Sequence, residues 1–308
     1  MKRRDFVKGA GIATAAATTL AAPAIAQERI QWNMVMPWPK GAPGVGVNAE
    51  RFAQRVNEMS GGRLEIRLFA AGELVPPFES FDAVQSGTAD ILHGTPYYWV
   101  GKSKAFNYFT TVPFGLSAIE LPAWLTYGGG QELWEEAYDD FGLQPFYAGS
   151  SCVQAGGWFR REINTWEDLQ GLKIRMAGLG GEVLRRAGSV VVLLPPGEIL
   201  PAMQSGAIDA AEWIGPWNDV AFGLQKVARY YYVPAFHEPG PALEISVNKA
   251  KFQALPADLQ AIVRYAAAAT AQDTSTDFTY HNIQAFRPLV DDYGVELRHY
   301  QSFAQALL

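Results

Sequence analysis

Apolar and amphipathic segments alternate along most of this chain. Short apolar runs that predict strands occupy residues 30–37, 64–69, 91–93, 144–148, 172–176 and 190–194. Between them lie stretches whose apolar residues recur at helical spacing, at residues 47–59, 78–85, 121–138, 181–187 and 198–204. Because parallel strands are joined through crossover helices, this alternation predicts an α/β fold built on parallel sheets.

The last part of the chain predicts one long helix. Pro256 suits a first helical turn, and the Ala-rich segment after it keeps helical spacing past Gln272. A strand-like run follows at residues 295–300. We therefore expect residues 251–308 to form a long helix and a strand that return across the rest of the fold.

An internal repeat divides the rest of the chain. Residues 83–90 read AVQSGTAD, and 119 positions further on residues 202–209 read AMQSGAID. Each copy predicts a helix that ends at a glycine and leads directly into a strand. Glycine-capped turns are common enough to recur by chance, but two matching units favour two lobes of similar build, which we place at residues 27–154 and 155–250.

The repeat also predicts where a ligand would bind. Displaced by the repeat distance, His93 corresponds to Glu212, so each residue follows an equivalent strand in its own lobe. Ligands of open α/β sheets bind beyond the carboxyl ends of the strands. A cleft between the lobes would then be lined by residues 93–98 on one side and by Glu212 and Trp213 on the other.

The first 26 residues predict an export signal. Arg3 and Arg4 precede a stretch rich in Gly, Ala and Thr, and the segment ends in a cleavage-site pattern before Gln27. The paired arginines are typical of a twin-arginine signal. A membrane anchor is the alternative, but the stretch has too few large aliphatic residues to be stable in lipid. We expect the mature protein to work in the periplasm.

Composition narrows the function further. The formal net charge of −6, without a basic stripe, argues against nucleic acid as a partner. A single cysteine, Cys152, excludes an internal disulfide and a cysteine metal cluster, and it is typical of an inert buried thiol. About 280 residues remain after the signal, which suits two lobes of ordinary domain size.

Enzyme motifs are absent from the sequence. It contains no Gly-x-Ser-x-Gly, no His-Glu-x-x-His and no phosphate loop, and residues 178–181 lack the full dinucleotide fingerprint. His237 and Glu238 form a pair without a second histidine. A periplasmic hydrolase that uses a cation is the alternative from another class, but no acid/base pair or nucleophile motif supports it. We expect no enzymatic activity.

Arg175 is the strongest candidate for ligand binding. It lies inside the apolar strand-like run at residues 172–176, where an unpaired charge would be costly. A ligand carboxylate would match its planar guanidinium with two parallel hydrogen bonds. A structural ion pair with an Asp or Glu of the protein is the other interpretation, and spacing alone favours it.

Gln154 and Glu212 form a second candidate site. Both carry side-chain oxygens beside small or aromatic residues. An amide oxygen, a carboxylate and main-chain carbonyls suit a hard cation such as Na⁺ or Ca²⁺ better than a transition metal. The nearby aromatic residues Trp213, Trp217 and Tyr98 are typical either of core packing or of the wall of a small-ligand site.

Several of these segments resemble one family. The chain from about residue 30 to 300 is similar to the solute-binding proteins of tripartite ATP-independent periplasmic (TRAP) transporters. The branch that binds 2-oxo acids and lactate is indicated by five segments: GSS at 149–151, QAGGWF at 154–159, LKIR at 172–175, DAAEWIGP at 209–216 and YYY at 230–232. The resemblance implies a two-lobed periplasmic binding protein fold with a ligand cleft between the lobes.

The resemblance also implies roles for particular residues. Arg175 would bind the carboxylate of the solute, with Tyr98, Gln154 and Trp213 as further contacts. Gln154, Glu212, the main-chain oxygen of Trp213 and Glu238 would surround a cation that bridges protein and solute. Many relatives outside the branch have Asn where Trp213 stands, so Trp213 favours the cation-assisted branch.

The implied cargo is a small 2-oxo monocarboxylate, with pyruvate as the leading candidate and Na⁺ or Ca²⁺ as the bridging cation. Lactate, a C4-dicarboxylate and a sugar acid are the alternative solutes, and the membrane subunits of the transporter are the implied partners. Members of the branch continue into further C-terminal helices, one of which exchanges between two subunits. This sequence ends at Leu308 before them, which argues against a homodimer formed by that route.

Overall fold

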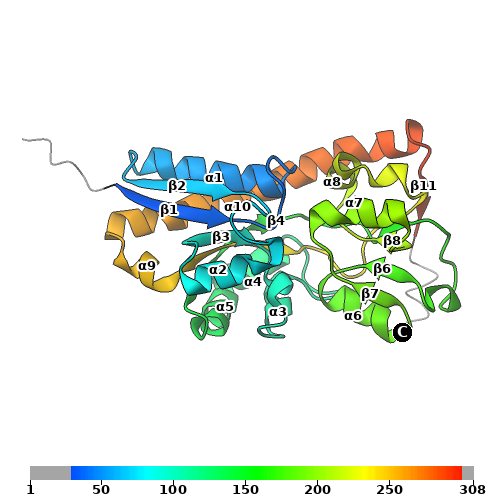
Figure 1. Cartoon of the computed structure of the whole chain (residues 1–308), viewed down its shortest axis with the longest axis horizontal. Helices are drawn as coiled ribbons and strands as arrows, with labels where there is room; N and C mark the ends of the chain where they lie inside the picture. Colours follow the sequence, from blue (N-terminus) through cyan, green and yellow to red (C-terminus); the bar gives the residue numbers. More distant parts are fainter. Residues whose placement is uncertain (1–28, 300–308) are drawn as a thin grey trace, which may run out of the picture.

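The computed structural model describes residues 29–299, which form two lobes, each built around its own sheet (Figure 1). The predicted export signal at residues 1–26 lies outside the described residues. Within residues 29–299 no helix is both long and apolar enough to cross a membrane. The α/β class and the two lobes that we predicted are confirmed.

The first lobe holds a sheet of five strands. In spatial order they are β2 (Leu64–Phe69), β1 (Ile30–Val35), β3 (Ile91–Gly94), β10 (Ala242–Asn248) and β4 (Leu143–Ser150). The strands β2, β1 and β3 are parallel, whereas β10 runs antiparallel to both of its neighbours. The helices of this lobe are α1 (Val45–Met59), α2 (Ser80–Ser86), α3 (Phe106–Thr110), α4 (Glu120–Tyr127), α5 (Gly130–Asp139) and α9 (Lys249–Ala254).

Helix α1 shows how burial positions these elements. Val45, Ala49, Phe52 and Val56 recur at helical spacing and are fully buried. They form one apolar face, and α1 contacts β2 and the long C-terminal helix. Helix α1 therefore covers one face of the sheet, while α2, α3 and α5 lie on the opposite face (Figure 1).

The second lobe holds a sheet of six short strands. In spatial order they are β11 (Glu296–Arg298), β9 (Tyr230–Tyr232), β5 (Gly157–Phe159), β8 (Ala210–Ala211), β6 (Lys173–Arg175) and β7 (Val190–Val192). Its helices are α6 (Gly178–Arg186), α7 (Pro196–Ser205) and α8 (Pro216–Phe222). Short 3₁₀ helices also occur in the two lobes, namely η1 (Pro77–Glu79), η2 (Pro96–Trp99), η3 (Glu167–Leu169) and η4 (Leu224–Lys226).

The internal repeat is a structural repeat. Helix α2 ends at Gly87 and α7 ends at Gly206, and both glycines adopt the left-handed conformation, with φ of 82° and 78°. Each is followed by an aspartate that accepts a backbone hydrogen bond from the neighbouring strand. Asp90 Oδ2 lies 2.6 Å from the Asn33 amide, and Asp209 Oδ2 lies 3.0 Å from the Lys173 amide. The repeat therefore places β3 and β8 equivalently in the two lobes.

Our prediction of one helix at residues 121–138 is wrong, because two helices occupy this range. Helix α4 ends before Gly128, and α5 begins at Gly130. Gly129 has a φ of 81°, a conformation that glycine adopts without strain. A Cβ at Gly130 would lie 2.7 Å from the ring of Trp124, so the glycines are needed for the turn.

The chain crosses between the lobes more than once. It leaves β4 for β5 near residue 154, then returns after β9 to add β10 to the first sheet. Residues 242–248 therefore pair within the first sheet, although we assigned residues 155–250 to the second lobe. The predicted long helix is α10 (Ala257–Asp291), which contacts β4 and α1 of the first lobe and α8 of the second (Figure 1, orange to red).

Candidate functional site

Arg175 ends β6 and lies where the two lobes meet. Its side chain is 0% exposed. Nη1 donates to the main-chain oxygen of Glu212 at 2.6 Å and to Glu212 Oε2 at 2.9 Å. Nη2 donates to the hydroxyl oxygen of Tyr98, in the first lobe, at 3.3 Å. The ion pair with Glu212 is the structural role that the sequence spacing favoured for Arg175. Through its hydrogen bond to Tyr98, Arg175 also connects the second lobe to the first.

Two buried carboxyl groups face this single guanidinium. Glu212 and Glu238 are 0% and 1% exposed. Oε1 of Glu212 and both carboxyl oxygens of Glu238 have no hydrogen-bond partner among the described residues. Burial raises the pKa of Glu238 to about 8, although Arg175 and, more weakly, the Tyr97 hydroxyl act in the opposite direction. Burial and the neighbouring Glu238 also raise the pKa of Glu212, against the lowering effect of Arg175.

Gln154 lies at the crossing between β4 and β5. Its amide nitrogen Nε2 donates to Ser151 Oγ at 2.7 Å, while Oε1 has no partner among the described residues. Its backbone joins the segments that carry the two carboxyl groups. The backbone N–H of Gln154 donates to the main-chain oxygen of Glu238 at 3.2 Å. The backbone N–H of the next residue, Ala155, donates to the main-chain oxygen of Ile214 at 2.9 Å. The amide oxygen is thus a further unpaired buried acceptor.

Aromatic side chains from both lobes surround Arg175. The guanidinium carbon lies 5.4 Å from the ring centre of Trp213. Trp38 lies between the lobes, with its ring centre 5.7 Å from Tyr98 and 6.4 Å from Trp213. Trp38 Nε1 also donates to His93 Nδ1 at 2.9 Å. Tyr98 and Trp213, predicted to border the site, therefore lie beside Arg175, whereas Trp217 stacks on His281 of α10.

His237 is a site residue that the sequence did not single out. It is 1% exposed, and neither ring nitrogen has a hydrogen-bond partner among the described residues. Nε2 lies 3.8 Å from Glu238 Oε1. Burial, with a smaller contribution from Arg175, lowers the pKa of His237 to about 3, so the ring is neutral at physiological pH. The sequence shows only the pair His237 and Glu238, without the second histidine of a metal-binding motif, and so does not predict this position.

The glycines at the start of α6 make room for the site. A Cβ at Gly178 would lie 2.6 Å from the ring of Tyr97, and a Cβ at Gly180 would lie 2.6 Å from the ring of His237. Both rings therefore pack directly on the helix backbone. In this chain the glycine run at residues 178–181 serves close packing at the junction between the lobes.

The donor set fits a hard cation. Ligand atoms of Glu212, His237 and Glu238 lie within 4.8 Å of one another, and Gln154 adds an unpaired oxygen. Carboxylate and amide oxygens are the groups that Na⁺ and Ca²⁺ prefer. The two carboxyl groups share one guanidinium, so ionising both leaves one negative charge that Arg175 does not balance. A bound cation would supply that charge and accept the unpaired oxygens.

Cavities lie on both sides of this cluster. One of about 430 Å³, the mouth pocket, is lined by residues of both lobes, among them Tyr97, Asn107, Met176 and Gly178. Another of about 250 Å³, the hinge pocket, is lined by Gln154 and by residues next to the crossings between the lobes.

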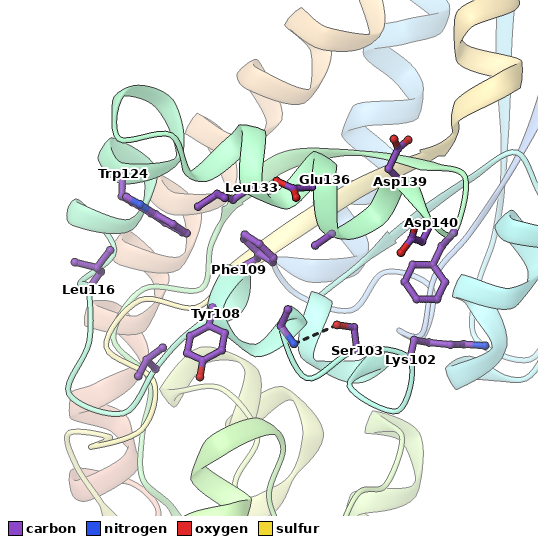
Figure 2. Close-up of a pocket in the computed structure, with 14 residues that line it drawn as sticks. Lys102, Ser103, Tyr108, Phe109, Leu116, Trp124, Leu133, Glu136, Asp139 and Asp140 are labelled. Atoms are coloured by element: carbon purple, nitrogen blue, oxygen red, sulfur yellow. Dashed lines mark hydrogen bonds between the residues drawn. The ribbon is translucent and has the colours of Figure 1, made fainter.

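A larger cavity is separate from the cluster. It measures about 990 Å³ and lies on the first lobe between α3, α4 and α5 (Figure 2). Phe109, Trp124 and Leu133 form its apolar walls, and Glu136 and Asp140 lie at its edge (Figure 2). None of the predicted site residues lines it.

Two α/β lobes that enclose polar side chains at their strand ends are typical of extracytoplasmic binding proteins. Comparison with known proteins agrees with this class. The sequence profile described as bacterial extracellular solute-binding protein, family 7, matches residues 35–306. The chain belongs to this family, whose members are solute-binding receptors and not enzymes.

Relatives within the family are closely similar over most of the chain. The monocarboxylate 2-oxoacid-binding periplasmic protein of Nostoc sp. PCC 7120 is 45% identical over 273 residues, which cover 86% of this chain and 75% of the relative. A TRAP solute-binding protein from Pseudoalteromonas atlantica, solved with sodium and pyruvate, is 40% identical, with a TM-score of 0.88 over 91% of this chain and 85% of the other. One from Colwellia psychrerythraea, solved with calcium and pyruvate, is 38% identical, with a TM-score of 0.87 over 91% and 87%.

Proposed function

We propose that this chain is the periplasmic receptor of a TRAP transporter and captures a 2-oxo monocarboxylate of about the size of pyruvate together with one cation. The observation that carries the proposal is the set of unpaired oxygens on Gln154, Glu212 and Glu238 beside the buried Arg175. The ligands of the two solved relatives, pyruvate with sodium or calcium, support it.

Arg175 would bind the carboxylate of the solute. Its Nη2 nitrogen and the Tyr98 hydroxyl come from different lobes, so a carboxylate placed at both would hold the lobes together. A ligand that contacts both lobes shifts the population toward the closed form. Arg175→Ala should lower solute affinity by several kcal/mol, that is by about a hundredfold or more, because a buried charge partner is lost.

Gln154, Glu212, Glu238 and the main-chain oxygen of Trp213 would hold the cation. The cation would place a positive charge next to Arg175. It would therefore favour solutes that carry a keto or hydroxyl oxygen on the carbon next to the carboxylate, because that oxygen can bind the cation. The buried oxygens would then gain the partner that they lack within the described residues. Na⁺ and Ca²⁺ both suit this donor set.

The surroundings of Arg175 favour a monocarboxylate over a C4-dicarboxylate. A second solute carboxylate would need a second cationic group. Beside Arg175 lie instead two acids, Glu212 and Glu238, and His237, which burial keeps neutral. Lactate shares the carboxylate and the neighbouring oxygen, so it is the second candidate solute. The receptor would deliver either solute to the membrane subunits of the transporter.

Calorimetry with the metal-stripped mature protein tests the proposal. Pyruvate, longer 2-oxo acids, lactate, succinate and a sugar acid would each be titrated at one fixed concentration of Na⁺ or Ca²⁺. We expect measurable affinity for the 2-oxo acids, weaker affinity for lactate, and none for succinate or the sugar acid. Tight binding of succinate or the sugar acid in preference to pyruvate would overturn the proposed cargo.

A further inference from the structure

The mouth pocket opens to solvent between the two lobes, and every residue that lines it belongs to one lobe or the other. Its walls come from residues 97–108 of the first lobe and residues 176–193 of the second. The crossings between the sheets, at residues 151–156 and 233–241 and along α10, contribute none of its lining residues, although His237 of the second crossing packs against Gly180 behind one wall. No crossing segment lines the cavity itself, so its two walls can separate when the lobes open.

The mouth pocket is directly beside the Arg175 cluster. Met176 and Gly178, which line it, follow Arg175 in the sequence. Tyr97 lines it from the other lobe and packs against Gly178, and its ring centre lies 5.1 Å from the Tyr98 ring in a stacked pair. The Tyr97 ring and the short turn after β6 therefore border the pocket and lie close to the cluster.

The hinge pocket on the other side is a poorer route. Val153, Gln154 and Ala155 from one crossing line it together with Val233 and Pro234 from the other. The backbone N–H of Ala155 donates to the main-chain oxygen of Ile214, and the backbone N–H of Ala235 donates to the main-chain oxygen of Gln154, each at 2.9 Å. These hydrogen bonds connect the two crossing segments. A solute that entered here would have to break the connections on which the lobes hinge.

The rim of the mouth pocket is basic although the chain carries a formal net charge of −6. Lys104 of the first lobe and Arg185 and Arg186 of the second line it, against one acid, Glu182. Glu182 pairs with both arginines. Lys104 is exposed and makes no ion pair within the described residues. An anion that approaches an acidic protein thus meets local positive charge at the opening next to Arg175.

We infer that the mouth pocket is the entry vestibule of the receptor and that its basic rim, with Lys104 as the main unpaired charge, accelerates capture of the anionic solute. The inference rests on the proposed function, since it assumes a carboxylate solute. Fields of this kind raise association rates and are weakened by salt, while contacts in the final complex set the dissociation rate. Lys104 therefore acts on the encounter and not on the bound state.

Stopped-flow binding of pyruvate to the wild type, Lys104→Gln and Lys104→Glu tests this inference. Ionic strength would be varied with choline chloride while the Na⁺ or Ca²⁺ concentration is held constant. At low ionic strength we expect the association rate constant to fall about threefold in Lys104→Gln and about tenfold in Lys104→Glu, with the dissociation rate constant unchanged. In about 0.5 M salt the three proteins should agree within about twofold.

Lys226→Glu is the matched control. Lys226 is an exposed lysine of the second lobe that lines a different cavity, so the same charge change is made away from the mouth pocket. Equal association rates in Lys104→Glu and Lys226→Glu at low salt would overturn the vestibule and leave the proposed function intact. A slower dissociation or a loss of binding confined to Lys104→Glu would also overturn it. Failure of the wild type to bind any carboxylate of the panel would overturn the proposed function itself.

Discussion

Two pairs of buried carboxyl groups differ in how their oxygens are satisfied. Asp219 accepts hydrogen bonds from Trp158 Nε1 at 2.9 Å, the Tyr231 hydroxyl at 2.7 Å and the Ile214 amide at 3.2 Å. Glu244 accepts from Trp99 Nε1 at 2.7 Å and from Ser246 Oγ at 2.6 Å. Glu212 has one unpaired oxygen, and Glu238 has two.

The difference separates structural from ligand-binding acids. Burial penalises each of the four carboxylates, and protein donors offset that penalty for Asp219 and Glu244. For the carboxyl oxygens of Glu212 and Glu238, Arg175 is the main donor among the described residues, and three of the four oxygens lack a partner there. We attribute the missing donors to a cation and a solute. Replacing a member of the first pair should therefore change stability, and replacing a member of the second should change binding.

The largest effect is expected from Glu238→Gln. It removes a carboxylate that we assign to the cation, so solute affinity should fall about a hundredfold or more in calorimetry. The unfolding free energy of the ligand-free protein should change by no more than about 1 kcal/mol, because within the described residues only a weak interaction with Tyr97 is altered. Loss of several kcal/mol of stability with binding intact would mean that Glu238 is structural.

Asp219→Ala should show the opposite behaviour. It leaves the Trp158 and Tyr231 donors buried without an acceptor, which should lower the unfolding free energy by about 3 kcal/mol in urea denaturation. Asp219→Asn, which keeps one acceptor oxygen, is the control and should lose less. Solute affinity of the folded Asp219→Asn protein should stay within about tenfold of the wild type.

The contribution of Glu244 to the stability of the ligand-free protein should fall as pH rises. Burial raises the pKa of Glu244 to about 7, above its ordinary value near 4.5. Below pH 4.5 the Glu244 carboxyl is protonated in both the folded and the unfolded protein. Between pH 4.5 and 7 it ionises in the unfolded protein but stays protonated in the folded one, so the free energy of unfolding decreases until the pH passes 7. The loss of this contribution should approach about 2 to 3 kcal/mol between pH 4.5 and 7, measured by urea denaturation as the difference between the wild type and Glu244→Gln. A difference that stays constant over this range would show that Glu244 ionises normally.

Binding should also depend on pH, by less than the roughly hundredfold effect expected for Glu238→Gln. Burial raises the pKa of Glu238 to about 8, so this carboxyl is largely protonated at neutral pH without ligand. A cation requires the ionised form, so binding should release a proton. Apparent affinity should rise up to about tenfold per pH unit between pH 6 and 8. Calorimetry in buffers of different ionisation enthalpy would detect the proton, and Glu238→Gln should abolish its release.

Much of the fold was visible in the sequence because its signals are local. The strand at residues 64–69 and the glycine caps of the repeat are contiguous patterns, and the structure has them as predicted. The strands β5, β8 and β9 span two or three residues each, too few to show a period. β10 was missed although it is longer, because it is buried throughout and lacks the alternation of a half-exposed strand.

The site was predicted in the same uneven way. The charge of Arg175 inside an apolar run marks a buried arginine, and the repeat links the neighbourhoods of His93 and Glu212. Glu238 came only from the resemblance to the family, and His237 was missed. Both lie between β9 and β10, in a segment without periodicity whose position depends on contacts across the two lobes. Their assignment as ligands stays a prediction.

The most direct test of the central claim is the affinity for pyruvate measured at several cation concentrations. Metal-stripped protein would be titrated by calorimetry with Na⁺ or Ca²⁺ varied at constant ionic strength. If one cation binds with each solute, the apparent dissociation constant should fall about tenfold for each tenfold rise in cation below saturation, and Glu212→Gln should abolish this dependence. The same dissociation constant at every concentration of both cations would contradict the account.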